Sequence, residues 1–201
     1  MDFSLTDEQR AIRDMARTFA QEELIPNCTE FDRLPDGEDS FPWDLVKRGS
    51  ELGFNALAVP EKYGGSGADV LTQCIVIEEL SAGEPAVSKV YSHNWKALFG
   101  LMAIASEEQV QRVVPGFLED PGYCISIGMT EPNTGSDNSL PYSGTLAAGP
   151  NLSAVRQGSH YVLNGSKQFI AMGAQAKFMT IFARTDKTVP WTEGASAFML
   201  F

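Results

Sequence analysis

The sequence has 201 residues and a formal net charge of −11 at pH 7, and hydrophobic residues make up 43% of it. This composition is typical of a soluble globular protein that buries one sizeable core or two smaller ones. Because the chain is acidic and has no basic cluster, it lacks the positive surface that nucleic-acid binding requires. We therefore expect no nucleic-acid partner.

The amino-terminal residues and the cysteine positions show which classes of protein are excluded. Several charged residues stand at the amino terminus before any long apolar run, so we expect no signal peptide, and no run approaches the length of a membrane span. Cys28, Cys74 and Cys124 are odd in number and far apart, which argues against disulfides and zinc sites. The patterns predict a cytoplasmic protein without a metal site.

Helical periodicity dominates the first 121 residues. Apolar residues recur at helical spacing over 12–20, and Thr6 with Gln9 forms a capping-box pattern in front of them. A second capping box, at Ser106 and Gln109, opens the last of the predicted helices. Helices after the first are predicted at 42–53, 69–82, 85–104 and from 106 to just before 121.

After residue 121, short β-rich runs alternate with turns. The predicted strands are 123–129, 145–148, 161–163, 168–171, 178–184 and 197–201, and the segments 32–40 and 185–194 are predicted loops. This change predicts a helical domain over 1–121 and a β-domain over 122–201. Because the last strand runs to the end of the chain with an apolar edge, we expect the β-domain to be incomplete.

One loop combines residues that can hold a polar ligand. The run Met129–Asp137 reads Met-Thr-Glu-Pro-Asn-Thr-Gly-Ser-Asp and follows a predicted strand. Pro132 fixes φ and Gly135 can adopt a positive φ, so we expect the backbone to turn and to present N–H groups to an anion or a ring edge. An ordinary polar turn, in which the acidic side chains bond to their own backbone, explains the same residues.

A second segment bears on that choice. Asn164-Gly165 lies between the apolar runs 161–163 and 168–170, and Asn-Gly in such a position is the strongest short hairpin signal. We therefore predict a hairpin that turns at these two residues. Lys167, just after the turn, is interpreted as a surface residue.

The two blocks together resemble the middle domain of the acyl-CoA dehydrogenase family. They read Thr-Glu-Pro-x-x-Gly-Ser-Asp and Asn-Gly-x-Lys-x-aromatic-Ile, in the right order, and the segments 3–9 and 60–67 are similar to the same family. The resemblance covers essentially the whole chain. It implies an α+β fold, with an all-helical amino-terminal domain followed by a small antiparallel β-barrel-like domain. The family's carboxy-terminal helical bundle is absent from these residues.

The resemblance implies FAD-dependent α,β-dehydrogenation of an acyl-CoA thioester, in fatty acid metabolism. In the family, the thioester is held between the flavin ring and a carboxylate base, which lets proton and hydride leave together. That base belongs to the carboxy-terminal bundle, so the resemblance implies no catalytic residue here and activity only with the missing half. It further implies an electron acceptor such as an electron-transfer flavoprotein, and a homo-oligomer or hetero-oligomer.

The resemblance also assigns the contacts of the cofactor. Flavin-binding positions are implied at Ile127, Met129, Thr130, Gly135, Ser136, Phe169, Ile170 and Ala171. Ser136 is expected to meet the pantetheine arm of the substrate as well. His93 is the other candidate for a substrate contact, in the acyl pocket, and a histidine on the helix surface or satisfied in the core is the alternative.

Two positions depart from the family pattern. Phe169 stands where the family usually has Trp, which keeps an aromatic wall and removes the indole N–H. Ala171 stands where a Thr or Ser hydroxyl usually lies near flavin N5, and losing one such donor costs on the order of 3 kcal/mol in the transition state. Ala171 and the early end of the chain leave a second hypothesis open, a non-catalytic flavin- or acyl-CoA-binding subunit of a mixed oligomer. Dehydrogenase and oxidase also stay open.

Overall fold

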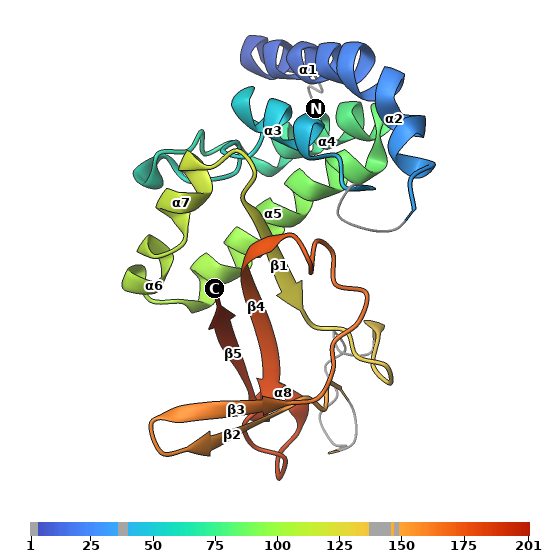
Figure 1. Cartoon of the computed structure of the whole chain (residues 1–201). Coiled ribbons are helices and arrows are strands. Elements are labelled where there is room, and N and C mark those ends of the chain that lie inside the picture. Colours follow the sequence, from blue (N-terminus) through green and yellow to red (C-terminus); the bar gives the residue numbers. More distant parts are fainter. Residues whose placement is uncertain (1–3, 36–39, 137–145, 147–148) are drawn as a thin grey trace. The chain divides into compact units, whose positions relative to one another are not determined.

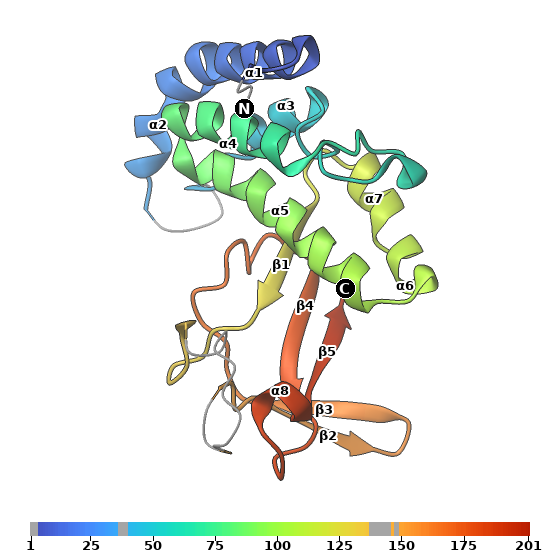
Figure 2. The same cartoon turned by 180° about the vertical axis from the view of Figure 1, so that it is seen from behind.

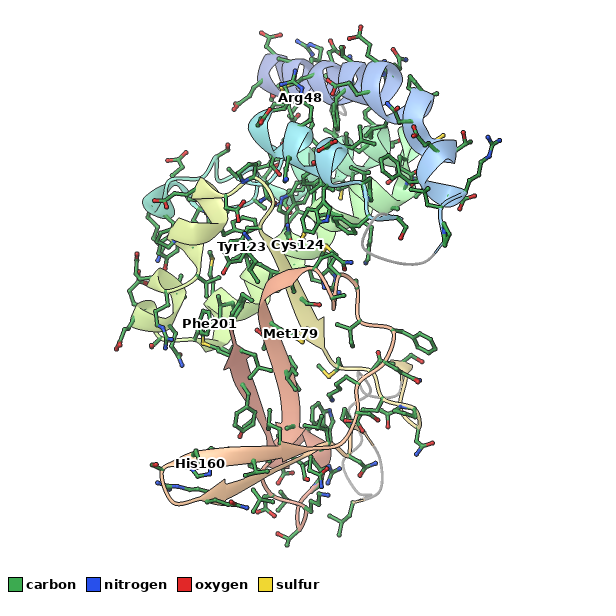
Figure 3. All side chains as sticks on the ribbon, viewed as in Figure 1. Arg48, Tyr123, Cys124, His160, Met179 and Phe201 are labelled. Carbon is green, nitrogen blue, oxygen red and sulfur yellow. The ribbon has the colours of Figure 1, made fainter. Side chains whose placement is uncertain are left out.

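The computed structural model describes residues 4–35, 40–136, 146 and 149–201 (Figure 1). By its internal contacts the chain divides into a helical unit, Met1–Tyr123, and a β-unit, Cys124–Phe201, and Figure 3 labels the two residues at the division. Among the described residues, no helix is both long and apolar enough to cross a membrane. The same residues contain no group of three or more His, Cys, Asp or Glu side chains that could hold a metal ion.

Helices make up the regular structure described in the first unit. They are α1 (Asp7–Phe19), the π-helix η1 (Ala20–Leu24), α2 (Ile25–Asp32), α3 (Trp43–Glu51), the 3-10 helix η3 (Glu61–Tyr63), α4 (Val70–Gly83), α5 (Pro85–Ile104), α6 (Glu107–Gln111) and α7 (Val114–Glu119). Helix α4 packs between α1 and α5, as both views show (Figures 1 and 2).

Both predicted capping boxes are confirmed. The Gln9 N–H donates to the Thr6 hydroxyl at 3.1 Å, and the Thr6 N–H donates to the Gln9 side chain at 3.1 Å. Ser106 and Gln109 repeat the exchange in front of α6. Each box satisfies helix N–H groups that lack a partner within the helix.

Two prolines account for the differences from the predicted helices. The first helix continues past residue 20 through η1 and α2, because Pro26 lies in the first turn of α2, where its missing N–H is tolerated. The last predicted helix is two helices, α6 and α7, and Pro115 lies in the first turn of α7.

Aromatic side chains form the centre of the helical unit. The Phe54 ring lies 5.8 Å from the ring of Phe19 and 5.9 Å from that of Tyr91, centroid to centroid. The buried Tyr91 hydroxyl donates to the Val46 carbonyl at 2.7 Å, so its polar end is satisfied. A Cβ at Gly49 would come within 2.2 Å of that hydroxyl, so the close approach of α3 to Tyr91 of α5 requires glycine at this position.

The β-unit contains a mixed sheet. Its strands are β1 (Cys124–Gly128), β2 (Ser153–Gln157), β3 (His160–Asn164), β4 (Ala176–Arg184) and β5 (Ala195–Leu200), and a short helix, α8 (Trp191–Gly194), precedes β5. The strand order is β1-β4-β2-β3, and β5 pairs with β4 on the edge opposite β1. The α+β class is thus confirmed.

The predicted antiparallel arrangement holds for only part of the sheet. Strands β2 and β3 are antiparallel, as are β4 and β5, but β1 runs parallel to β4. A parallel pair needs a long connection, and the chain between β1 and β4 provides one. Strand β2 meets β4 at a single position, Ser153 opposite Arg184, and the β2–β3 hairpin crosses the ends of β4 and β5 in both views (Figures 1 and 2).

The prediction of a hairpin turn at Asn164-Gly165 is wrong, because the hairpin turns before β3 and not after it. Strands β2 and β3 turn through Gly158, at φ +63°, and His160 at the tip is labelled in Figure 3. Asn164-Gly165 instead ends β3, because Gly165 has φ +141° and a Cβ there would lie 3.0 Å from the Leu152 Cα. Residues 168–171 form no strand. The strand predicted at 145–148 lies outside the described residues apart from Leu146, which is in a turn.

Candidate functional site

The loop after β1 is a tight turn centred on Pro132. Glu131 and Thr134 exchange two backbone hydrogen bonds, of 3.0 and 3.1 Å, so Pro132 and Asn133 form the tip. Gly135 does not adopt the positive φ that the sequence suggested, and a Cβ there would meet nothing within 4 Å. Gly135 and the Ser136 side chain are exposed after the turn.

Hydrogen bonds hold a second segment, Gln168–Ala171, against this loop. The Gln168 N–H donates to the Thr130 carbonyl at 3.0 Å, and its side-chain amide donates to the Glu131 carbonyl at 3.2 Å. The Ser126 hydroxyl, on β1, donates to the Ala171 carbonyl at 2.6 Å. The fold therefore brings together the two sequence blocks that were predicted to form one site.

The second segment has an exposed aromatic ring and, within the described part of the chain, several unbonded peptide N–H groups. Phe169 is 87% exposed at φ +55°, and Met172 also has φ +55°. Positive φ is uncommon for residues of this size and costs on the order of 1–3 kcal/mol, and such strain gathers at binding sites. Among the described residues, the N–H groups of Phe169, Ile170 and Ala171 donate no hydrogen bond. The segment can therefore bind a planar ring through one face and a row of donors.

The other candidate residues in and before the loop differ in the groups that they can present to a ligand. Ile127 is half-buried within β1 and pairs with Thr180 of β4, so the sheet engages its backbone. Met129 and Thr130 are half-buried at the end of β1. No hydrogen bond of the Thr130 or Ser136 hydroxyl occurs within the described part of the chain. These hydroxyls are thus available to a ligand.

A buried ion pair lies behind the loop. Lys167 Nζ is 2.8 Å from Glu131 Oε1, and each side chain is only 7% exposed. Burial alone would raise the pKa of Glu131, but hydrogen bonds from Lys167 and from the N–H groups of Asn151 and Leu152 hold that pKa below its ordinary value. Lys167 is therefore not the surface residue that the sequence suggested.

His93 lies on α5 in the helical unit and is buried, with 5% of its surface exposed. Within the described residues neither ring nitrogen has a hydrogen-bond partner. Burial, and then the charges of Lys96 and Lys89, lower the pKa of His93 to about 4, so the ring is neutral at pH 7. Neither a surface position nor a satisfied core position describes it, and a substrate contact stays a prediction.

The helical unit also contains a large, mainly apolar cavity. Its volume is about 1100 Å³, and side chains of α4 and α5, among them Ile77 and Trp95, line it together with the loop before α4. Phe99, on its rim, is 78% exposed. His93 does not line this cavity.

Sequence reasoning missed the pair of Glu131 and Lys167 and the bonds of Gln168. The pair joins residues 36 positions apart, so no local pattern reveals it. One signal was present, because each of the two blocks that carry the resemblance contains one of the two opposite charges, Glu131 in the first and Lys167 in the second.

Family models match both units. The model described as acyl-CoA dehydrogenase, N-terminal domain, matches residues 6–120, and the model described as acyl-CoA dehydrogenase, middle domain, matches residues 126–200. The chain belongs to the acyl-CoA dehydrogenase family. The resemblance stated from the sequence is thereby confirmed.

Individual relatives extend this acyl-CoA dehydrogenase assignment. The short-chain specific acyl-CoA dehydrogenase of Clostridium acetobutylicum is 37% identical, over all of this chain and 49% of its own length. A chain in the structure of the electron transferring flavoprotein of Acidaminococcus fermentans superposes with a TM-score of 0.82, at 34% identity, over all of this chain and 49% of its own length. PigA, solved with FAD and proline, superposes with a TM-score of 0.80 at 25% identity, over all of this chain and 49% of its own length. This chain therefore spans about half the length of the relatives it matches.

Proposed function

We propose that this chain forms the FAD-binding part of an acyl-CoA dehydrogenase, an oxidoreductase that acts on the CH–CH group of an acyl-CoA thioester. Family membership supports the reaction class, and PigA, a relative solved with FAD, supports the cofactor. The observation that carries the proposal is the joined pair of segments: Gln168 bonds to Thr130, and next to it stand the exposed Phe169 ring and three N–H groups that donate no hydrogen bond among the described residues.

The residues present fit a flavin. An exposed aromatic ring gains from stacking on a planar ligand, and unpaired N–H groups gain hydrogen bonds to ring heteroatoms. Phe169, Ile170 and Ala171 would hold one edge of the ring system, and Met129 with Thr130 would hold another. Gly135, with open space at its Cβ position, and Ser136 would admit the phosphates. When bound, FAD supplies the acceptor for a hydride from the β-carbon of the thioester.

The chain's own residues would bind and orient rather than move protons. The Thr130 and Ser136 hydroxyls would fix the register of the cofactor, and Phe169 would exclude water from one side of it. We assign no proton acceptor to these residues. The base that removes the α-proton is proposed to lie outside them, in keeping with the half-length match to the relatives.

The redox partner and assembly follow from the same proposal. An electron acceptor such as an electron-transfer flavoprotein would reoxidise the protein, and the structure of the Acidaminococcus fermentans flavoprotein contains a chain similar to this one. We propose a homo-oligomer or hetero-oligomer for the complete protein.

Ala171 favours a second candidate, a subunit that binds flavin or acyl-CoA without performing the oxidation. Its methyl group offers no hydroxyl where charge would develop, although its N–H is available. A flavin that binds but does not accept electrons from acyl-CoA would support this candidate.

Anaerobic titration tests the proposed function. The protein that carries this chain is loaded with FAD and mixed with saturated acyl-CoA thioesters of graded length while the absorbance of oxidised flavin is followed. We expect bleaching with at least one thioester. Tight FAD binding without bleaching by any of them would favour the non-catalytic subunit. Failure to bind FAD would overturn the dehydrogenase and leave only a subunit that binds acyl-CoA.

A substitution at Ala171 sharpens that test. If its side chain faces the reacting flavin atom, Ala171→Thr restores a hydroxyl and speeds flavin reduction by about tenfold or more, part of the roughly 100-fold or larger effect that one such donor has. The gain is expected in the reduction rate and not in thioester affinity. Ala174→Thr, on an exposed alanine three residues later, is the matched control. An equal rate in wild type and Ala171→Thr, with an intact flavin spectrum, would remove this residue from the site.

A further inference from the structure

The ion pair of Glu131 and Lys167 is expensive to bury. Both side chains are 7% exposed, and charged side chains are almost never buried to this extent without a partner. Replacing such a pair by apolar residues of similar volume is often neutral or stabilising, so a gain in fold stability does not by itself account for the pair. Its geometry offers a better account.

Both charged groups are fully engaged by neighbouring segments. Glu131 Oε1 accepts from the Leu152 N–H at 2.9 Å and from Lys167 Nζ at 2.8 Å, and Glu131 Oε2 accepts from the Asn151 N–H at 2.6 Å. Lys167 Nζ also donates to the Met129 carbonyl at 3.0 Å. One carboxylate and one ammonium group therefore connect the loop after β1 with the start of β2 and with residue 167.

Lys167 lies just before residues 169–171, which form one wall of the proposed site. Lys167 is adjacent to Gln168, whose N–H donates to the Thr130 carbonyl at 3.0 Å, and Phe169 comes next. The Met129 and Thr130 carbonyls thus receive bonds from two consecutive residues, and this fixes the spacing between the two segments. A shift at residue 167 would move the Phe169 ring and the N–H groups after it.

We propose that Glu131 and Lys167 are positioning residues of the flavin site, which set the distance and register between the loop bearing Met129 and Thr130 and the wall at 169–171. This inference rests on the proposed function. Neither charged group is exposed, so the pair acts through the segments that it joins and does not touch the cofactor. Its contribution is preorganisation, and in metal sites the removal of partners of this indirect kind lowers affinity or activity by roughly 10–100-fold.

A double-mutant cycle tests the proposal in the protein that carries this chain. Lys167→Met and Glu131→Gln each leave one buried group without its partner, whereas Glu131→Gln with Lys167→Met leaves no unpaired charge. FAD dissociation constants, the fine structure of the flavin absorption band and melting temperatures are measured for all four proteins. Lys62→Met, at the exposed Lys62–Glu107 pair in the helical unit, is the control.

We expect the double variant to melt above at least one single variant and yet to bind FAD at least tenfold more weakly than wild type, with an altered absorption band. Lys167→Arg, which keeps the charge, should retain part of the affinity. If FAD affinity instead follows melting temperature across the cycle, or if folded variants bind as wild type does, the pair is only structural and the proposal falls. If a single variant does not fold, the double variant and Lys167→Arg decide. Wild type that fails to bind FAD would overturn the proposed function itself.

Discussion

The helix caps of the helical unit and the buried Glu131 carboxylate of the β-unit find their hydrogen-bond partners over very different sequence distances. In the helical unit, Thr6 caps α1 through Gln9, three residues away, and Ser106 caps α6 in the same manner. In the β-unit, the partners of the Glu131 carboxylate lie 20, 21 and 36 residues away. Local partners stabilise an element wherever it stands, whereas distant partners fix how several segments meet. A binding site built from loops needs the second kind.

The largest expected contrast is between two ion pairs. Lys167→Met leaves the buried Glu131 carboxylate without its counterion and should destabilise the fold by about 3–5 kcal/mol. Lys62→Met removes the partner of Glu107 at a pair that water largely screens, so its effect should be small. Urea unfolding of both variants measures the difference. Comparable losses would mean that burial does not distinguish the two pairs.

A smaller contrast separates two glycines of the β-unit. Gly165 combines φ +141° with close contact to Leu152, so Gly165→Ala should destabilise by about 3 kcal/mol through strain and overlap. Gly158 has φ +63° and nothing within 4 Å of its Cβ position, so Gly158→Ala should destabilise the fold by only about 1 kcal/mol. Thermal melts of the two variants decide, and a larger loss at Gly158 would contradict the turn geometry.

A pH effect is expected from the helical unit. Because the pKa of His93 is lowered to about 4 in the folded chain, the unfolded chain binds a proton first as the pH falls. Stability should therefore decline from about pH 6.5 toward pH 4, by on the order of 2 kcal/mol, and His93→Gln should flatten this part of the profile. His160→Gln, at an exposed hairpin residue, is the control. An unchanged slope in His93→Gln would show that other groups cause the decline.

The same contrast explains how much the sequence could predict. The caps at Thr6 and Ser106 depend on residues three apart, and both were predicted correctly, although the helix predicted after Ser106 is two helices, α6 and α7. The Asn164-Gly165 hairpin was a local inference that failed, because the long-range contact of Gly165 with Leu152 decides the backbone there. Local signals predicted elements, and tertiary contacts overrode them where segments meet.

For the candidate site, the sequence identified the two segments but not what joins them. The blocks at 129–137 and 164–171 were chosen from their residues, and the structure joins them through the Gln168 bond to Thr130. The positive φ of Phe169 and the burial of Lys167 have no local sequence signature. Both depend on partners that only the folded chain brings within reach.

The most direct test of the central claim uses Phe169. Because its ring is 87% exposed, Phe169→Ala should leave the melting temperature nearly unchanged, whereas loss of a stacking face should weaken FAD binding by about tenfold. Phe99→Ala, at a ring 78% exposed in the helical unit, is the matched control and should bind FAD as wild type does. Titration of all three proteins with FAD, followed by flavin fluorescence, gives the comparison. Equal FAD affinity for Phe169→Ala and wild type, or no binding by wild type, would contradict the account of these segments as a flavin site.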